Sequence, residues 1–307
     1  MSKTLIILNP HAGSGRAGKL WTQIEPMLWD KLGELVVAVT QNPGEVAQHL
    51  DKAYASGLYR VIAIGGDGTN HALVNALADL NAQHPDGPPM IYGTLPVGTG
   101  RDWARSRGIP FDLEKAAEWI AHAQPQPTDI GLLTLEGGNA APRREHFLNI
   151  ASAGLGGDVV KRVNRRTQRR PWTFLRSTVE SILSYRPEKM KITVDGETWF
   201  DDRALVVAVA NGTTFGHGMK IAPQATTDDG LFDVVVVENA PKLRVLAALR
   251  RVYEGTHLTH PNVAFRRGKE IVVTSAQGAL GLELDGEQAQ GERLTFTVRP
   301  GLLHVLS

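Results

Sequence analysis

Two glycine-rich segments that each contain an aspartate carry the strongest chemical signal in the sequence. The first, Gly65-Gly66-Asp67-Gly68-Thr69, follows the uninterrupted apolar run Val61–Ile64. The second, Gly98-Thr99-Gly100-Arg101-Asp102, comes shortly after the apolar run Met90–Leu95. Glycine turns between a strand and a helix present backbone N–H groups and a positive helix end to phosphate. A bare aspartate would repel that phosphate, so we expect a divalent cation or a reacting hydroxyl between them.

The two aspartates, Asp67 and Asp102, predict magnesium chemistry. Both follow strands of one predicted sheet, and open α/β sheets bind ligands at the carboxyl ends of their strands. Mg²⁺ is typically held by one or two carboxylates together with phosphates and water. Asp129, at the junction where the sequence pattern changes, is a third candidate ligand. The alternative is that Asp67 and Asp102 only cap helices. The presence of two such turns in one sheet makes this alternative less favoured.

A third glycine-rich loop, His11–Lys19, contains two cations but lacks the Walker A spacing. Alone it is a weak phosphate signal, because many such loops are plain connections.

The elements that must position these turns alternate in type over the first 130 residues. Predicted strands are Thr4–Leu8, Leu35–Thr40, Val61–Ile64 and Met90–Leu95, and predicted helices are Leu20–Leu28, Gly44–Ser56, one beginning near Thr69, and Asp112–Ala123 with Asp112 as N-cap. Strands alternating with helices predict a parallel sheet with right-handed crossovers.

Beyond about residue 130, short β-branched segments dominate. Predicted strands are Phe147–Ala151, Met190–Val194, Ala204–Ala210, Leu231–Val237, Glu270–Thr274, Leu280–Leu284 and Leu294–Val298. Turn signals such as Asp195-Gly196, Asp229-Gly230 and Asp285-Gly286 separate them, and two helices, Trp172–Tyr185 and Pro241–Tyr253, interrupt the series. This rhythm predicts an antiparallel β-sandwich-like second domain. The domains are therefore expected at residues 1–130 and 131–307.

Composition narrows the classes of protein. The 307 residues carry a net charge of +1, and no nucleic-acid reader motif is present, so a nucleic-acid partner is not expected. There are no cysteines, which excludes disulfides and thiolate metal sites. The first residues lack the features of a signal peptide, and no window has the apolar length of a spanning helix. A cytoplasmic protein is expected.

Taken in order, the motifs resemble the diacylglycerol kinase catalytic-domain superfamily. They are Asn9-Pro10, Gly65–Thr69, Gly98–Arg105, Phe147–Asp158, Asp229-Gly230 and Asp285-Gly286-Glu287. The resemblance covers essentially the whole chain and is closest to bacterial soluble lipid kinases related to the sphingosine kinases. The Gly-Gly-Asp turn alone is shared with NAD kinases and phosphofructokinases, whereas the ordered set is specific.

The fold implied by the resemblance has two domains with a cleft between them. An α/β N-terminal domain has a parallel sheet like that of phosphofructokinases and NAD kinases and binds the nucleotide. A mostly antiparallel β-sandwich C-terminal domain takes the lipid substrate. The extreme C-terminus, about residues 295–307, is expected to pack back on the first domain.

The resemblance also implies an ATP-dependent lipid kinase with assigned residues, phosphorylating diacylglycerol or another lipid alcohol. The nucleotide site would be lined by Asn9, Pro10, Thr40, Gly65, Gly66, Asp67, Gly68, Thr69 and Thr99. A catalytic Mg²⁺ would be held through water by Asp67, Asp102 and Asp129. The general base would be Asp285 or Glu287, with Asp67 also catalytic. A structural metal would be bound by Asp229 and by main-chain carbonyls of Thr226 and Leu231.

Two positions depart from the family pattern. Arg101 stands where asparagine is usual, and His71-Ala72 replaces a common Asn-Glu pair. Arg101 could contact a phosphate directly or reflect a changed nucleotide or substrate preference, and the missing glutamate removes a carboxylate that could orient the metal cluster. These departures keep open a nucleotide- or lipid-binding protein without turnover, beside the lipid kinase and an NAD kinase-like small-molecule kinase.

A cationic run, Lys161–Arg170, precedes Pro171-Trp172-Thr173-Phe174-Leu175. Basic residues beside aromatic and apolar ones suit docking on an anionic membrane, so peripheral membrane association is expected. The alternative is a solvated helix face. A homodimer is left open.

Overall fold

The computed structural model describes residues 3–138, 141–166 and 172–307. The chain divides into two compact units, one comprising Met1–Asp129 with Pro300–Ser307 and the other Ile130–Arg299. Two long strands, β5 (Pro125–Glu136) and β15 (Arg293–Leu306), each contribute residues to both units.

The first unit is built on a parallel sheet. Its strands are β1 (Thr4–Leu8), β2 (Leu35–Val39), β3 (Arg60–Gly65) and β4 (Ile91–Pro96). They are ordered β2-β1-β3-β4, and the end of β15 pairs in parallel with β4 through His304 and Val305. The apolar runs of β1 and β3 are buried, as expected for strands covered on both faces.

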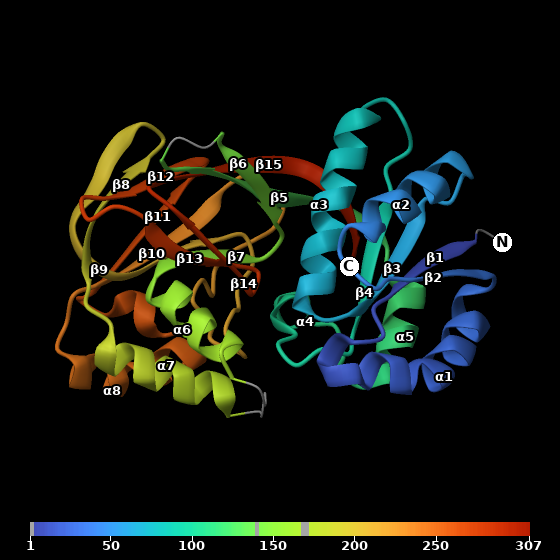
Figure 1. Ribbon diagram of the computed structural model, residues 1–307, viewed down its shortest axis with the longest axis horizontal. Coiled ribbons are helices and arrows are strands. Elements are labelled where there is room, and N and C mark those ends of the chain that lie inside the picture. Colours follow the sequence, from blue (N-terminus) through green and yellow to red (C-terminus); the bar gives the residue numbers. More distant parts are fainter. Residues whose placement is uncertain (1–2, 139–140, 167–171) are drawn as a thin grey trace. The chain divides into compact units, whose positions relative to one another are not determined.

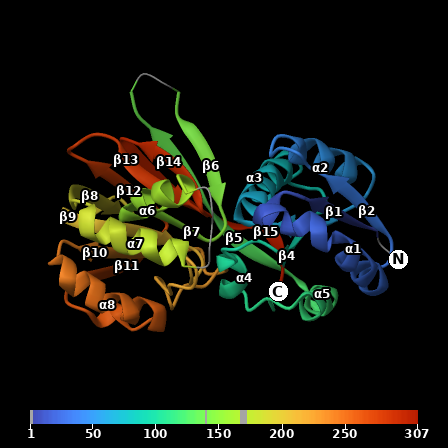
Figure 2. The ribbon, with the colours of Figure 1, turned by 60° about the horizontal axis from the view of Figure 1, so that its bottom comes forward.

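The described part of this unit contains five helices: α1 (Ala12–Leu32), α2 (Glu45–Ala55), α3 (Asp67–Gln83), α4 (Asp102–Ser106) and α5 (Leu113–His122). Helices α1 and α5 share one core cluster with the sheet. Helices α2 and α3 pack together against the opposite face, as Figures 1 and 2 show. The sheet therefore holds the amino ends of α3 and α4 at the carboxyl ends of β3 and β4.

The second unit is mostly antiparallel. Besides its parts of β5 and β15, it contains β6 (Arg143–Phe147), β7 (Ile150–Gly154), β8 (Glu188–Val194), β9 (Glu197–Ala210), β10 (Phe232–Glu238), β11 (Val263–Gly268), β12 (Glu270–Ser275), β13 (Leu280–Leu284) and β14 (Glu287–Gly291). Its main run of paired strands has the order β14-β13-β7-β9-β8-β12-β15. Outside this run, β10 pairs with β9 and β11, and β6 pairs with β5. A buried cluster that includes Phe147, Phe232 and Phe296 forms the sandwich core.

Three helices cover one outer face of this unit: α6 (Leu155–Asn164), α7 (Thr173–Ser184) and α8 (Lys242–Glu254), followed by the 3₁₀-helix η1 (His257–Thr259). Figure 1 shows them grouped on one side of the strands of their unit. Their apolar residues form two further clusters with β7, β9 and β10, separate from the sandwich core. No helix of the described residues is both long and apolar enough to span a membrane.

The predicted fold class is confirmed: a parallel α/β domain is followed by a mostly antiparallel β-sandwich. Asp112 caps α5 as predicted, accepting the Lys115 N–H at 3.1 Å. The predicted continuous strand Phe147–Ala151 is wrong. The chain breaks between β6 and β7, because the N–H groups of residues 148–150 bind a side chain, Asp285, instead of a neighbouring strand. The sequence reading also missed α6 and α4.

Candidate functional site

The two glycine turns of the first unit are packed directly against each other. The Gly98 N–H donates to the Gly65 carbonyl at 3.1 Å, and a Cβ at Gly98 would lie only 2.6 Å from Gly66 Cα. The loop after β1 joins them, since a Cβ at Gly13 would lie 3.1 Å from the Val97 carbonyl oxygen. Three glycine loops therefore meet at the carboxyl edge of the sheet, including the one whose sequence was a weak signal.

Asp67 opens α3 in the middle of this meeting point. Its helix has an extended Gly66 as N-cap and no side-chain cap. A Cβ at Gly100 would collide with the Asp67 carboxylate, so glycine there is what admits the acid. Asp67 contacts the second glycine turn because β3 and β4 are neighbouring strands, with Gly65 opposite Pro96 at their ends.

The other predicted nucleotide residues line the same edge. The Asn9 Nδ2 donates to Thr69 Oγ1 at 3.1 Å and its Oδ1 accepts the His11 N–H at 3.0 Å, which ties the end of β1 to the first turn of α3. Thr40 is buried, and its hydroxyl donates to the Leu8 carbonyl at 3.3 Å. The Pro10 carbonyl accepts the Gly18 N–H within the first loop. Gly68 and Thr99 are exposed.

Three arginines surround this edge. Arg101 adopts a left-handed conformation (φ 59°), and its Nε donates to the Gly98 carbonyl at 2.6 Å. Burial lowers the pKa of Arg101, and the like charges of Arg16 and Arg105 lower it further, whereas Asp67 opposes them. Arg101 and Arg105 are half-buried and Arg16 is exposed, and repulsion among such neighbouring cations is relieved by an anion. The cluster therefore has the electrostatics of a phosphate site.

Phe111 supports two of these cations. The guanidinium carbons of Arg101 and Arg105 lie 5.2 and 5.1 Å from the centre of its ring, within the range of cation–π contacts. The sequence reading singled out Arg101 but missed Arg16, Arg105 and Phe111. The two cations of the His11–Lys19 loop were the available signal for Arg16.

The acids predicted to hold the catalytic metal have different surroundings. Asp102 forms an ion pair with Arg105 at 3.0 Å. Asp129 is 3% exposed and accepts the Gly301 N–H at 2.8 Å. Among the described residues, no three His, Asp or Glu side chains are close enough to hold a metal directly. Asp67 and Asp102 have the hard oxygen donors that suit Mg²⁺ bound through water and phosphate, and that water-mediated set stays a prediction.

The two predicted bases of the second unit differ in their contacts. Asp285, in the β13–β14 hairpin with φ 50°, accepts N–H groups of Leu148, Asn149 and Ile150 at 2.7, 3.0 and 3.0 Å. Glu287 starts β14 and is exposed, and its side chain forms no hydrogen bond or ion pair with another of the described residues. Asp285 therefore anchors the hairpin, while the Glu287 carboxylate can meet a substrate.

The predicted structural-metal loop is closed by an arginine. Asp229 accepts the Thr226 hydroxyl at 2.6 Å and the Leu231 N–H at 3.1 Å, and it pairs with Arg267. Arg267 also pairs with the buried Asp233 at 2.8 Å. Burial alone would raise the pKa of Asp229, but these hydrogen bonds outweigh it and hold that pKa below its ordinary value. A metal there would compete with Arg267 for Asp229.

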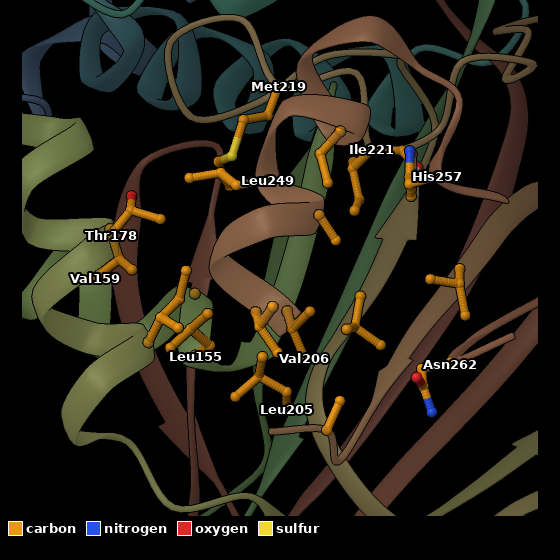
Figure 3. A pocket seen from close by; sticks show the side chains of 18 of the residues that line it. Leu155, Val159, Thr178, Leu205, Val206, Met219, Ile221, Leu249, His257 and Asn262 are labelled. Atoms are coloured by element: carbon orange, nitrogen blue, oxygen red, sulfur yellow. The ribbon is translucent and has the colours of Figure 1, made fainter. Parts of the chain in front are cut away.

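The second unit also contains an apolar pocket beneath α6, α7 and α8. The empty space among its lining residues is about 930 Å³, open solvent at its mouth included. Figure 3 shows Leu155, Val159 and Thr178 on one side and His257 and Asn262 on the other. Its walls are almost entirely aliphatic and aromatic, which suits a hydrocarbon chain. The sequence reading missed the pocket, because its residues come from many separate segments between Leu155 and Glu283.

Comparison with known proteins agrees with this arrangement. Residues 3–133 match the diacylglycerol kinase catalytic domain, and residues 149–307 match the YegS C-terminal NAD kinase beta sandwich-like domain. A probable YegS-like lipid kinase of Pseudomonas syringae pv. tomato is 32% identical over 89% of this chain and 83% of its own. A Bacillus subtilis diacylglycerol kinase is 27% identical over 94% of this chain and 90% of its own.

Solved structures share the fold. A diacylglycerol kinase from Bacillus anthracis superposes with a TM-score of 0.71 at 22% identity, covering 99% of this chain and 96% of its own. Yeast NADH kinase reaches 0.52 at 10% identity, covering 99% and 82%. With both halves matched in order and a relative above 30% identity, the chain belongs to the YegS-like branch of the diacylglycerol kinase catalytic-domain family.

Proposed function

We propose that this protein is an ATP-dependent lipid kinase that transfers the γ-phosphoryl group to a hydroxyl of diacylglycerol or a related lipid alcohol. The observation that carries the proposal is the meeting of the two glycine turns, with Asp67 seated against Gly100 beside three arginines. Phosphoryl transfer depends mainly on positioning and on neutralising charge, and this edge offers both.

The nucleotide would bind at the predicted residues Asn9, Pro10, Thr40, Gly65–Thr69 and Thr99. Backbone N–H groups at the start of α3 would face the phosphates, since no side chain caps that helix. Arg101, Arg16 and Arg105 supply positive charge to the same phosphates. Mg²⁺, held through water by Asp67 and Asp102, would neutralise charge on the transferred phosphoryl group. Asp129 completes the predicted set.

Glu287 is the proposed general base that takes the proton of the lipid hydroxyl. The base needs a carboxylate with accessible lone pairs, and the Glu287 side chain is exposed. Asp285 would act by positioning the hairpin, because its two oxygens already accept three backbone N–H groups.

The apolar pocket of the second unit would hold an acyl chain of the lipid. Burying a chain there gives about 0.8 kcal/mol per methylene. Near it, α7 and α8 expose Leu175, Leu183 and Leu243 together with Trp172, which precedes α7. These lie beside the cations Arg176, Lys242 and Arg244, which supports peripheral docking on an anionic membrane. Of the predicted basic run, residues 167–170, with Pro171, lie outside the described residues.

The direct test is phosphoryl transfer from γ-labelled ATP to lipids in mixed micelles, with products separated by chromatography. We expect lipid-dependent transfer by the wild type and at least a 100-fold loss in Asp67→Asn, since a carboxylate near the phosphates is removed, consistent with about 3 kcal/mol for a charged contact. The exposed Asp79→Asn on the same helix is the matched control. ATP turnover indifferent to lipid would favour an NAD kinase-like activity, and nucleotide binding without product would reject the kinase.

A further inference from the structure

One acidic side chain reaches the apolar pocket. Glu283 lies on β13 and is 7% exposed, and it is the only Asp or Glu among the described residues that line the pocket. On β13, Leu280, Leu282 and Leu284 point into the sandwich core, so Glu283 faces the opposite side, under α6. A carboxylate in such surroundings is costly unless donors hold it.

The pocket wall is built to keep this carboxylate in place. Glu283 is paired with Ser152 across the β13–β7 ladder, and the Ser152 hydroxyl donates to Glu283 Oε2 at 2.9 Å. A Cβ at Gly156, in the first turn of α6, would lie 3.5 Å from that same oxygen. The positive amino end of α6 therefore faces this carboxyl group. A carboxylate has about four acceptor positions, so it can take donors from the pocket as well.

We propose that Glu283 selects lipids that carry a second hydrogen-bond donor, besides the hydroxyl that is phosphorylated, close to the hydrocarbon chain. Amide N–H, ammonium and a second hydroxyl are such donors, whereas an ester has only acceptors and meets the carboxylate with repulsion. A site made to receive a donor discriminates strongly against analogues that lack it. This inference rests on the proposed lipid kinase activity and names its substrate class.

The test compares lipids of equal chain length: a diacylglycerol, a ceramide with an amide N–H, a sphingoid base with an ammonium, and a monoacylglycerol with a second hydroxyl. Wild type, Glu283→Gln, Glu283→Leu and the exposed control Glu292→Gln are assayed for kcat/KM. Binding of fluorescent analogues of the four lipids is measured without ATP. We expect the wild type to prefer the donor-bearing lipids about tenfold or more, as one charged hydrogen bond allows. Glu283→Gln should lose mainly activity on the ammonium lipid. Glu283→Leu should lose activity on all three donor lipids and should use the diacylglycerol better, because the repulsion between carboxylate and ester is removed.

A wild-type protein that uses or binds the diacylglycerol as well as the donor lipids would overturn the role of Glu283, and this holds even where a variant does not fold. Equal loss on all four lipids in Glu283→Gln, with an unchanged melting temperature, would overturn it too. If no lipid is phosphorylated but the binding preference for donor lipids persists and depends on Glu283, the kinase proposal fails while the pocket assignment stands.

Discussion

Arg101 is the most informative residue of the proposed nucleotide site at the carboxyl edge of the parallel sheet. It occupies a left-handed position next to the second glycine turn and is crowded by two other arginines. A cation kept in such a place is stabilised by a bound anion, so its contribution should appear when nucleotide binds rather than in the free protein.

Replacing Arg101 by asparagine, the residue usual at this position in the family, should therefore weaken nucleotide binding. We expect the KM for ATP to rise about tenfold or more, as for one lost charged hydrogen bond, with a smaller change in kcat. The melting temperature without ATP should stay constant or increase, because repulsion with Arg16 and Arg105 is relieved. Steady-state kinetics and thermal melts with and without ATP check this. An unchanged KM would remove Arg101 from the phosphate site.

Arg267 is the second informative residue, since it neutralises Asp229 and Asp233 together. Arg267→Met should cost about 2 kcal/mol of unfolding free energy, because it leaves the buried Asp233 without its charged partner. Arg266→Met is the matched control, since Arg266 pairs with the exposed Glu197. A chelator should not change the wild-type melting temperature, and millimolar Mg²⁺ should partly restore the Met variant. A wild type destabilised by chelator would instead support the predicted structural metal.

The same pair predicts a pH dependence. The pKa of Asp229 is lower in the folded protein than its ordinary value of 3.8. Its contribution to stability is therefore complete above that value and is lost as the pH falls through the folded pKa. In Arg267→Met the contacts of Arg267 that lower this pKa are gone, whereas the hydrogen bonds from Thr226 and Leu231 remain, so the acid limb of the melting curve should move part of the way to higher pH. Melting temperatures measured between pH 3 and 7, on the wild type and this variant, test the shift.

Among the elements, α6 is the one that places Glu283 in its surroundings. A Cβ at Gly157 would lie 2.6 Å from the Gly281 carbonyl carbon and 2.7 Å from the Leu282 nitrogen, both backbone atoms of β13. The helix can approach the strand this closely only because Gly157 lacks a side chain. The glycine pair Gly156-Gly157 thus sets the depth of the pocket wall.

Gly157→Ala should push α6 away from β13 and destabilise the protein by about 1–3 kcal/mol, despite the better helix propensity of alanine. Gly281→Ala, on the facing strand with open space around its Cβ position, is the control and should be nearly neutral. Denaturant unfolding of the two variants measures the difference. Equal stability of both would mean that the close contact between α6 and β13 is absent in solution.

At the scale of the whole molecule, the last residues of the chain belong to the first unit although they follow the second in sequence. Leu303, Val305 and Leu306 are buried, and Leu306 fills the space beside Gly93 of β4. The Gly301 N–H binds Asp129, and the Leu302 carbonyl accepts Asn81 Nδ2 at 3.0 Å. The segment thus supplies a strand and two side-chain anchors to the nucleotide unit.

Deleting Pro300–Ser307 should therefore damage the first unit. Each of the three buried side chains contributes roughly 1.5–3 kcal/mol, which together approaches the ~5–15 kcal/mol stability of a domain. We expect the truncated protein to lose cooperative unfolding, measured by calorimetry, and ATP binding, measured by nucleotide titration. Replacing the exposed Ser307 alone by alanine is the control. A truncated protein that still binds ATP would contradict this assignment.

Much of this architecture could be predicted from local pattern. The buried strands, the glycine turns, the Asp112 cap and the change from alternating to β-rich segments are encoded by neighbouring residues, because periodicity, glycine and N-cap chemistry act over a few positions. Where a distant group intervened, local reasoning failed: the strand predicted over 147–151 is broken by Asp285, more than 130 positions away.

The sequence by itself therefore determined the family, the order of elements and the residue types able to bind phosphate and Mg²⁺. Only the tertiary structure decided which of those residues share a contact. It seated Asp67 at Gly100, surrounded Arg101 with cations, tied Asp285 to three N–H groups and turned Glu283 toward an apolar pocket. The physical reason is that burial, close packing and charge repulsion depend on neighbours in space, which sequence spacing does not specify.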